Sequence, residues 1–191
     1  MDIKYSLKGE TNMSKKIVVL SGSPRKNGNT DRLSAAFVEG AESAGKAVTV
    51  FRVADMDIAG CRGCNQCFDG KGVCVQNDDA QIILEALKDA DAYVLASPIY
   101  FFSLTAQLRL AIDRTYALLR ASMPAKKAAL LITCGADSAS AADGAVATYK
   151  GMCGHSGRED AGIIIASGLH APGEIEGRPE LEQARRLGQE I

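Results

Sequence analysis

One stretch near the start of this chain limits its possible folds more than any other. The four apolar residues 17–20 make a short buried strand, and the ten residues 21–30, Ser-Gly-Ser-Pro-Arg-Lys-Asn-Gly-Asn-Thr, follow at once. A helical pattern then begins, and the free N–H groups and dipole of a helix start attract anions. The polar side chains that converge on the same point are Ser21, Ser23, Asn29 and Thr30. The stretch therefore predicts a strand, a phosphate-binding loop and a helix.

The positions of the glycines separate this loop from two common phosphate loops. A Walker loop has four residues between its glycines and then Lys-Ser/Thr, whereas five residues separate Gly22 from Gly28. A dinucleotide-binding loop has its second glycine where this chain has Pro24. The remaining interpretation is a site for a phosphate monoester, whose dianion would meet neutral donors and Arg25. An ordinary polar turn is the alternative, but the number of donors directly after a buried strand favours phosphate.

The charge balance of the chain and the length of its apolar stretches exclude several classes of function. The 191 residues include 22 Lys and Arg against 23 Asp and Glu, so we expect no basic face for a nucleic acid. The apolar stretches are too short to span a bilayer and the N-terminus lacks an apolar signal core, so we expect a cytoplasmic protein without membrane contact. We expect residues 1–12 to be a leader or extension without a fold, and residues 13–191 to form a single domain.

Strands and helices alternate along the whole chain. The expected strands are residues 17–20, 47–53, 92–97, 128–133 and 161–166. The expected helices are residues 29–44, a helix capped by Asp78 or Asp79, and residues 104–119, 142–151 and 179–191. This alternation predicts an α/β fold, namely a doubly wound parallel sheet with helices on both faces. A ligand of such a sheet lies at the carboxyl ends of the strands.

Three loops reach that edge of the sheet and should share one ligand. They are residues 21–29, 98–103 and 133–143. The second loop contains three consecutive aromatic residues, 100–102, in a chain with only 5% aromatic residues. An aromatic wall beside a phosphate site suits a flat ring carried on a phosphorylated chain, although core packing explains Phe102 equally well. The third loop is small and polar, so its backbone N–H groups suit the polar edge of such a ring.

Several separate motifs follow one another in this chain at characteristic spacing. They are residues 21–30, Asp78-Asp79, residues 90–92, residues 97–100, and Leu108 through Asp113-Arg114. Together they resemble the NADPH-dependent FMN reductase and iron–sulfur flavoprotein family of flavodoxin-like proteins. The resemblance implies a five-stranded sheet in the order 2-1-3-4-5, bound FMN, and a homodimer or homotetramer with FMN near the subunit interface. It also implies FMN contacts from Ser21, Ser23, Arg25, Asn29, Thr30, Pro98, Ile99, Tyr100, Phe101, Thr133, Cys134 and Gly135.

The same resemblance implies that the flavin carries the chemistry. A hydride would pass from NAD(P)H to the flavin, and the electrons would then leave to a small acceptor such as a flavin or a quinone. No catalytic side chain is expected. The two histidines of the chain, His155 and His170, are interpreted as solvated loop residues.

Four of the six cysteines lie in one loop between residues 55 and 78. Cys61, Cys64, Cys67 and Cys74 have C-x2-C-x2-C-x6-C spacing, which resembles the cluster motif of iron–sulfur flavoproteins. Four close thiolates can bind a [4Fe–4S] cluster or a zinc ion, and four reduced thiols without a metal are the third possibility. Structural disulfides are not expected in a cytoplasmic chain. Cys134 and Cys153 are interpreted as a loop thiol and a core thiol.

Two functions of different classes therefore stay open. One is an oxidoreductase that takes electrons from NAD(P)H and gives them to a small molecule. The other is an electron carrier, with FMN and a cluster, that exchanges electrons with a ferredoxin-like protein. A flavodoxin-like binding module without flavin is a weaker third interpretation.

Overall fold

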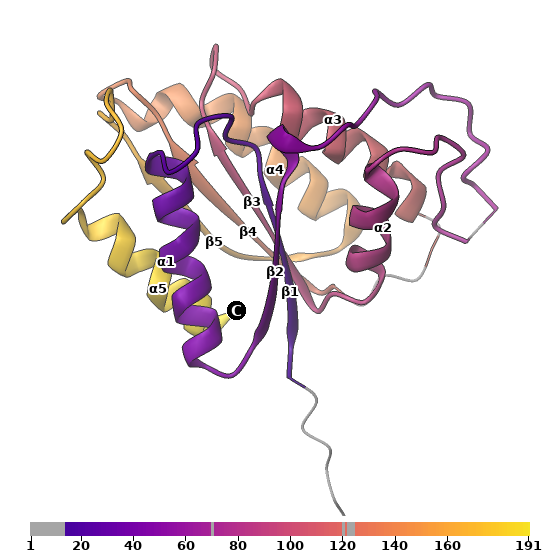
Figure 1. The fold of residues 1–191 in the computed structure, drawn as a ribbon, viewed down its shortest axis with the longest axis horizontal. Coiled ribbons are helices and arrows are strands. Elements are labelled where there is room, and N and C mark those ends of the chain that lie inside the picture. The colour runs from indigo at the N-terminus through magenta and orange to yellow at the C-terminus, as the bar shows by residue number, and fades with distance from the viewer. Residues whose placement is uncertain (1–13, 70, 120, 122–124) are drawn as a thin grey trace, which may run out of the picture.

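Five parallel strands form one sheet in the order β2-β1-β3-β4-β5 (Figure 1). The computed structural model describes residues 14–69, 71–119, 121 and 125–191, so the expected leader lies outside the described residues. The strands are β1 Lys16–Ser21, β2 Ala47–Arg52, β3 Ala92–Pro98, β4 Lys127–Thr133 and β5 Glu159–Ala166. The helices are α1 Asn29–Ser43, α2 Ala80–Lys88, α3 Ala106–Arg114, α4 Asp143–Ser156 and α5 Pro179–Glu190. This arrangement confirms the predicted doubly wound, flavodoxin-like sheet.

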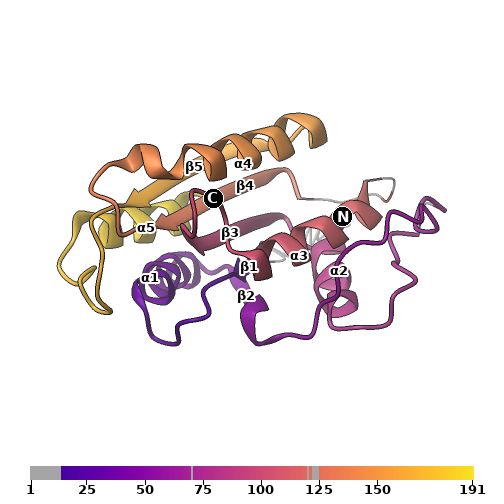
Figure 2. The same cartoon turned by 90° about the horizontal axis from the view of Figure 1, so that it is seen from above.

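Helices cover both faces of the sheet, and successive side chains of a strand are buried on opposite faces. On β1, Val18 and Leu20 face α2, α3 and α4, whereas Ile17 and Val19 face α1 and α5. Figure 2 shows α4 over β4 and β5, on the side of the sheet opposite α1. All residues of β3 up to Ser97 are buried, as expected for a central parallel strand. In a sheet of this kind, a ligand is expected at the loops that follow the carboxyl ends of the strands.

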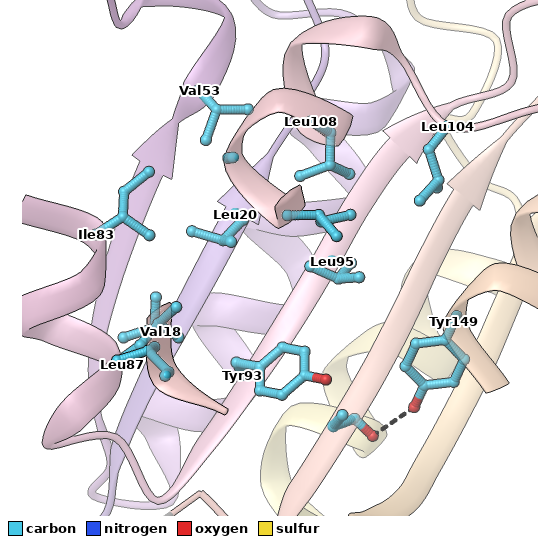
Figure 3. Packing of buried hydrophobic residues seen from close by; sticks show 14 of the residues in the cluster. Val18, Leu20, Val53, Ile83, Leu87, Tyr93, Leu95, Leu104, Leu108 and Tyr149 are labelled. Atoms are coloured by element: carbon cyan, nitrogen blue, oxygen red, sulfur yellow. Dashed lines mark hydrogen bonds between the residues drawn. The ribbon is translucent and has the colours of Figure 1, made fainter. Parts of the chain in front are cut away.

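Figure 3 shows how the helices cover one of these faces. Leu20 of β1 and Leu95 of β3 point toward Leu108 of α3, while Val18 lies beside Leu87 of α2. On the far side of the same face, the Tyr149 hydroxyl donates a hydrogen bond to the Ala128 carbonyl over 2.7 Å. This bond ties α4 to β4 close to the bulge between Ala128 and Ala129.

Two predicted helices differ from the observed ones. The helix expected over residues 104–119 is α3 followed by a short 3₁₀-helix, Thr115–Leu118. The helix expected to end at Gly151 continues to Ser156 and ends at Gly157, whose φ of 64° is left-handed. His155 therefore lies in the last turn of α4 and not in a loop. Tyr149 and Cys153 are buried, so packing of one face keeps α4 helical despite its glycines.

Helices α1 and α5 approach each other through two glycines. A Cβ atom on Gly40 would overlap the backbone of Arg185, and one on Gly188 would overlap the carbonyl oxygen of Phe37. These contacts are with backbone atoms, which cannot rotate away as a flexible side chain can. Both positions therefore need the hydrogen atom of glycine.

We expect Gly188→Ala to destabilise the protein by about 1–3 kcal/mol or more, because the added methyl group forces α5 away from α1. The matched control is Gly151→Ala in α4, where nothing lies within 4 Å of an added Cβ. That change should stabilise the helix by about 1 kcal/mol. Urea denaturation midpoints of the two variants and the parent give the comparison. Equal midpoints for Gly188→Ala and the parent would contradict the close helix contact.

Candidate cofactor site

A cavity of about 200 Å³ lies at the carboxyl edge of the sheet. It is lined by the loops that follow β1, β3, β4 and β5. The residues expected from the sequence that line it are Ser23, Arg25, Asn29, Thr30, Pro98, Ile99, Tyr100, Thr133, Cys134 and Gly135. The structure thus brings together ten of the twelve expected residues. Ser21 and Phe101 are outside the lining.

The loop after β1 is fixed in place by the start of α3. The Thr105 hydroxyl donates a hydrogen bond to the Gly22 carbonyl over 2.8 Å. A Cβ atom on Gly22 would lie 2.6 Å from the Cβ of Leu108, so only glycine allows this approach. The loop then enters α1 through Gly28, which is the N-cap and provides no side-chain hydrogen bond to the helix. The first N–H groups of α1 therefore have no side-chain cap and can bind an anion.

Buried hydroxyl groups surround the start of α1. The Thr30 and Thr133 hydroxyl oxygens are 2.7 Å apart and hydrogen-bonded, and they join the loops after β1 and β4. The backbone N–H of Arg25 donates to the Ser23 hydroxyl over 3.3 Å. The Ser21 hydroxyl is buried and has no hydrogen-bond partner among the described residues. A buried donor without a partner is costly, but this one lies outside the cavity lining and carries no argument for a ligand there.

Asn29 lines the cavity, but its side chain has other partners than the expected anion. Its Nδ2 donates to the Ala171 carbonyl over 2.9 Å, and its Oδ1 accepts from the N–H of Gly173 over 2.9 Å. Asn29 thus fastens the segment after β5 to the start of α1. This segment also brings Leu169 and His170 into the cavity lining, which the sequence analysis missed. The parallel direction of β5 was the available signal, because its carboxyl end must reach the same edge.

The aromatic loop projects from this edge instead of packing into the core. Phe101 is 97% exposed and Phe102 is 69% exposed, which excludes the alternative that Phe102 packs in the core. Tyr100 and Ser103 exchange two backbone hydrogen bonds of 3.1 and 3.2 Å. The two residues between them have φ angles of 50° and 64°, as in a type I′ turn. Left-handed backbone at bulky residues costs about 1–3 kcal/mol each, and such strain is typical of functional sites.

The four cysteines of the loop after β2 are free thiols that lie near one another. Cys61 and Cys64 are exposed, Cys74 is half-buried and Cys67 is buried. Burial raises the pKa of Cys67, and the charges of Cys74, Cys61 and Cys64 raise it further. Within the described part of the chain, no three His, Cys, Asp or Glu side chains are arranged around a point that could hold one metal ion. A [4Fe–4S] cube attaches each cysteine to a different iron, so it does not require the single-centre geometry of zinc.

A second cavity of about 640 Å³ lies between the sheet, α3, α4 and the cysteine loop. Its floor consists of buried side chains that include Leu20, Leu95 and Tyr93, and burial raises the pKa of Tyr93 to about 12. The cavity is larger than the one at the sheet edge, but it lacks the hydroxyl cluster and the uncapped helix start. The smaller cavity is therefore the candidate site for a phosphorylated cofactor.

Comparisons with known proteins agree with this geometry. Residues 15–152 match the family model of the NADPH-dependent FMN reductases. An iron–sulfur flavoprotein of Archaeoglobus fulgidus is 38% identical over 99 residues, which are 52% of this chain and 44% of that protein. One from Methanocaldococcus jannaschii is 37% identical over 100 residues, 52% of this chain and 51% of that protein. The chain thus spans about half the length of the curated relatives it matches.

Solved structures show the same fold at lower sequence identity. An NAD(P)H:quinone oxidoreductase from Methanothermobacter marburgensis superposes with a TM-score of 0.73 at 21% identity, over 93% of this chain and 96% of that one. An azoreductase from Bacillus anthracis superposes with a TM-score of 0.69 at 19% identity, over 93% of this chain and 100% of that one. Within the described residues, no helix is long and apolar enough to cross a membrane.

Proposed function

The chain belongs to the NADPH-dependent FMN reductase family, and from this membership we propose that it binds FMN at the carboxyl edge and oxidises NADH or NADPH. The observation that carries the proposal is the convergence of an uncapped helix start, buried hydroxyl groups and an apolar wall on one cavity. We place the phosphate at Ser23, Arg25 and Thr30, which line this cavity, whereas Ser21 lies outside the lining. Asn29 shapes this end of the cavity through the segment after β5.

The opposite walls of the cavity suit a flat ring. Pro98, Ile99 and Tyr100 follow β3 and provide apolar surface, while residues 133–135 follow β4 and provide backbone polar groups. FMN, when bound, supplies the chemistry by accepting a hydride from a reduced nicotinamide and releasing electrons one or two at a time. The side chains of this chain bind and orient it, and none of them has to transfer a proton.

Reduction of the bound flavin tests this function. FMN-loaded protein mixed with NADH or NADPH in the absence of oxygen should lose its flavin absorbance within seconds. Addition of a small quinone should then restore the flavin absorbance, because a small molecule is the proposed acceptor. If neither nicotinamide bleaches the bound flavin, the reductase function is contradicted.

The cysteine loop supports a second function. We propose that Cys61, Cys64, Cys67 and Cys74 hold a [4Fe–4S] cluster through which electrons pass between FMN and a ferredoxin-like protein. The support is the compact C-x2-C-x2-C-x6-C spacing of the four thiols, together with relatives that are named iron–sulfur flavoproteins. A zinc ion bound by the same four thiols is the alternative occupant of the loop.

The exposed aromatic tip supports a homodimer or homotetramer. Phe101 and Phe102 are adjacent, largely exposed aromatic side chains beside the cavity, and an apolar tip of this kind suits contact with a neighbouring subunit. We expect Phe101→Asn with Phe102→Gly to shift the protein to monomer. Asn-Gly is the preferred pair of a type I′ turn, so the loop keeps its shape. Light scattering at micromolar concentration measures the change.

The control for this pair is Ile82→Ser, which removes an isoleucine that is 57% exposed on α2, away from the cavity. The control should keep the parent's mass. A parent protein that is already monomeric with FMN bound would contradict the proposed assembly.

A further inference from the structure

Arg114 is a charged side chain in the interior that the reductase chemistry does not use. It is the last residue of α3, and only 2% of it is exposed. Burying a guanidinium group is costly unless it is fully paired. Its partners lie at the two ends of the cysteine loop, one before Cys61 and the others after Cys74.

The guanidinium group joins these two ends directly. Nη1 donates to the Ala59 carbonyl over 2.9 Å, and Nη2 donates to the Gln76 carbonyl over 3.2 Å. Nη1 also lies 2.5 Å from Oδ2 of Asp78, whose side chain is 11% exposed. Asp78 completes the connection, because the same Oδ2 accepts a 3.0 Å hydrogen bond from the N–H of Ala59. The two ends of the cysteine loop are therefore joined by contacts to one buried ion pair.

Asp78 is held in its charged form by these contacts. Burial alone raises its pKa, but hydrogen bonds from Arg114, Ala59 and Ala80 outweigh burial and lower the pKa overall. Gln76 adds a further closure, because its Nε2 donates to the Gly60 carbonyl over 3.1 Å. The loop can thus be exposed at Cys61 and Cys64 while its base stays fixed.

The same guanidinium group lies beside the fourth cysteine. Burial lowers the pKa of Arg114, but the hydrogen bond to Asp78 and the neighbouring Cys74 sulfur outweigh burial and raise it. The Nε of Arg114 is buried and has no hydrogen-bond acceptor within the described residues. One N–H donor of the guanidinium group is therefore not used by the closure of the loop.

We propose that Arg114 is a positioning residue for the cysteine loop, which fixes Cys74 from the protein side and places a buried positive charge beside its sulfur. The proposal deepens the proposed cluster function and rests on it for the effect of the charge. Joining the two ends of the loop would not by itself require the positive charge of Arg114, since well-packed apolar residues often replace a buried ion pair without loss of stability. A cation beside a thiolate ligand stabilises negative charge on the ligand and on the reduced cluster. Net charge and hydrogen bonds to the sulfurs are factors that set cluster potentials.

The test compares variants at the ion pair with a control on the same helix. Arg114→Met alone leaves the Asp78 carboxylate buried without its partner, so the principal variant is Arg114→Met with Asp78→Asn. Arg114→Lys keeps the positive charge but loses the pair of hydrogen bonds that Nη1 and Nη2 donate to the Ala59 and Gln76 carbonyls. The control is Arg109→Met, whose parent side chain is 41% exposed and pairs with Asp113 at the surface of α3. The full chain is used throughout, first without metal and then after anaerobic reconstitution with iron and sulfide.

Two measurements distinguish the role of Arg114 in joining the ends of the loop from the effect of its positive charge on the cluster. Without metal, hydrogen exchange of the Ala59 and Phe68 amides, which donate to the Asp78 carboxylate and the Asn65 carbonyl, should become at least tenfold faster in the double variant and in Arg114→Lys. Amides of α1 and α5 should keep parent rates. After reconstitution, the potential is compared in the single variant Arg114→Met, because the double variant removes a positive and a negative charge together. The midpoint potential of the remaining cluster should become more negative in Arg114→Met, and Arg114→Lys should stay closer to the parent. Arg109→Met should match the parent in both measurements.

Failure of the proposed role of Arg114 can be distinguished from failure of the chain to bind a cluster. Unchanged exchange of the loop in the double variant overturns the closure. An unchanged potential in an Arg114→Met variant that retains its iron overturns the effect of the charge. A parent that takes up no iron overturns the cluster function and with it the effect of the charge, while faster exchange in the same variants still supports Arg114 as the residue that closes the loop.

Discussion

Each of the four single variants Cys61→Ser, Cys64→Ser, Cys67→Ser and Cys74→Ser is expected to contain no bound iron after anaerobic reconstitution, whereas the parent contains about four iron atoms per chain. A cluster needs all of its thiolates, and metal binding and folding of the surrounding loop are coupled. Loss of one sulfur should therefore release the whole cluster rather than a quarter of it. Iron, zinc and FMN contents are measured on the same samples.

The bound flavin provides an internal reference for these variants. The FMN cavity lies on other loops than the cysteines, so FMN content should equal that of the parent. Cys153→Ser is the matched control, because this thiol is buried in α4 outside the loop and should not affect iron. If the parent holds neither iron nor zinc after reconstitution, the carrier function is wrong and the reductase function stands alone.

The second large effect is expected at the phosphate end of the cavity. Ser23→Ala with Thr30→Ala should weaken FMN binding by about 3–6 kcal/mol, because each hydrogen bond to a charged group is worth about 1.5–3 kcal/mol. This corresponds to a hundredfold or greater rise in the Kd, since about 1.4 kcal/mol is a factor of ten. Fluorescence titration of the flavin-free protein with FMN measures the change.

A second pair of hydroxyl groups outside the cavity serves as the control. Ser43 and Thr148 donate to carbonyl groups of their own helices, so Ser43→Ala with Thr148→Ala should bind FMN as the parent does. Equal affinity of the cavity pair and the control pair would show that the phosphate does not lie at the start of α1.

Much of the fold could be predicted because its signals are local. The apolar runs of β1 and β3 and the donors of residues 21–30 are adjacent in sequence, and alternation of strands and helices fixes the parallel sheet. Parallel strands end at one edge, which brought the predicted loops to one cavity. The length of α4 was missed because Gly151 and Gly154 indicate a turn, whereas burial of Tyr149 and Cys153 keeps the helix.

The rest depends on contacts between distant segments. The sequence predicts that Asn29 binds the anion, but its side-chain amide is hydrogen-bonded to residues more than 140 positions later in the chain. Phe102 reads as a possible core residue because hydrophobicity does not reveal a left-handed turn that points it outward. The role of Arg114 depends on Ala59, Gln76 and Asp78 meeting at one guanidinium group, and no spacing in the sequence indicates that meeting.

The central claim is that the cavity at the carboxyl edge recognises FMN through its terminal phosphate. Titration of the flavin-free protein with FMN, riboflavin and FAD under identical conditions tests it most directly. The account predicts that FMN binds at least a hundredfold more tightly than riboflavin, which lacks the phosphate, and that FAD binds more weakly than FMN because its phosphate is not terminal. Equal affinities for FMN and riboflavin would contradict the account.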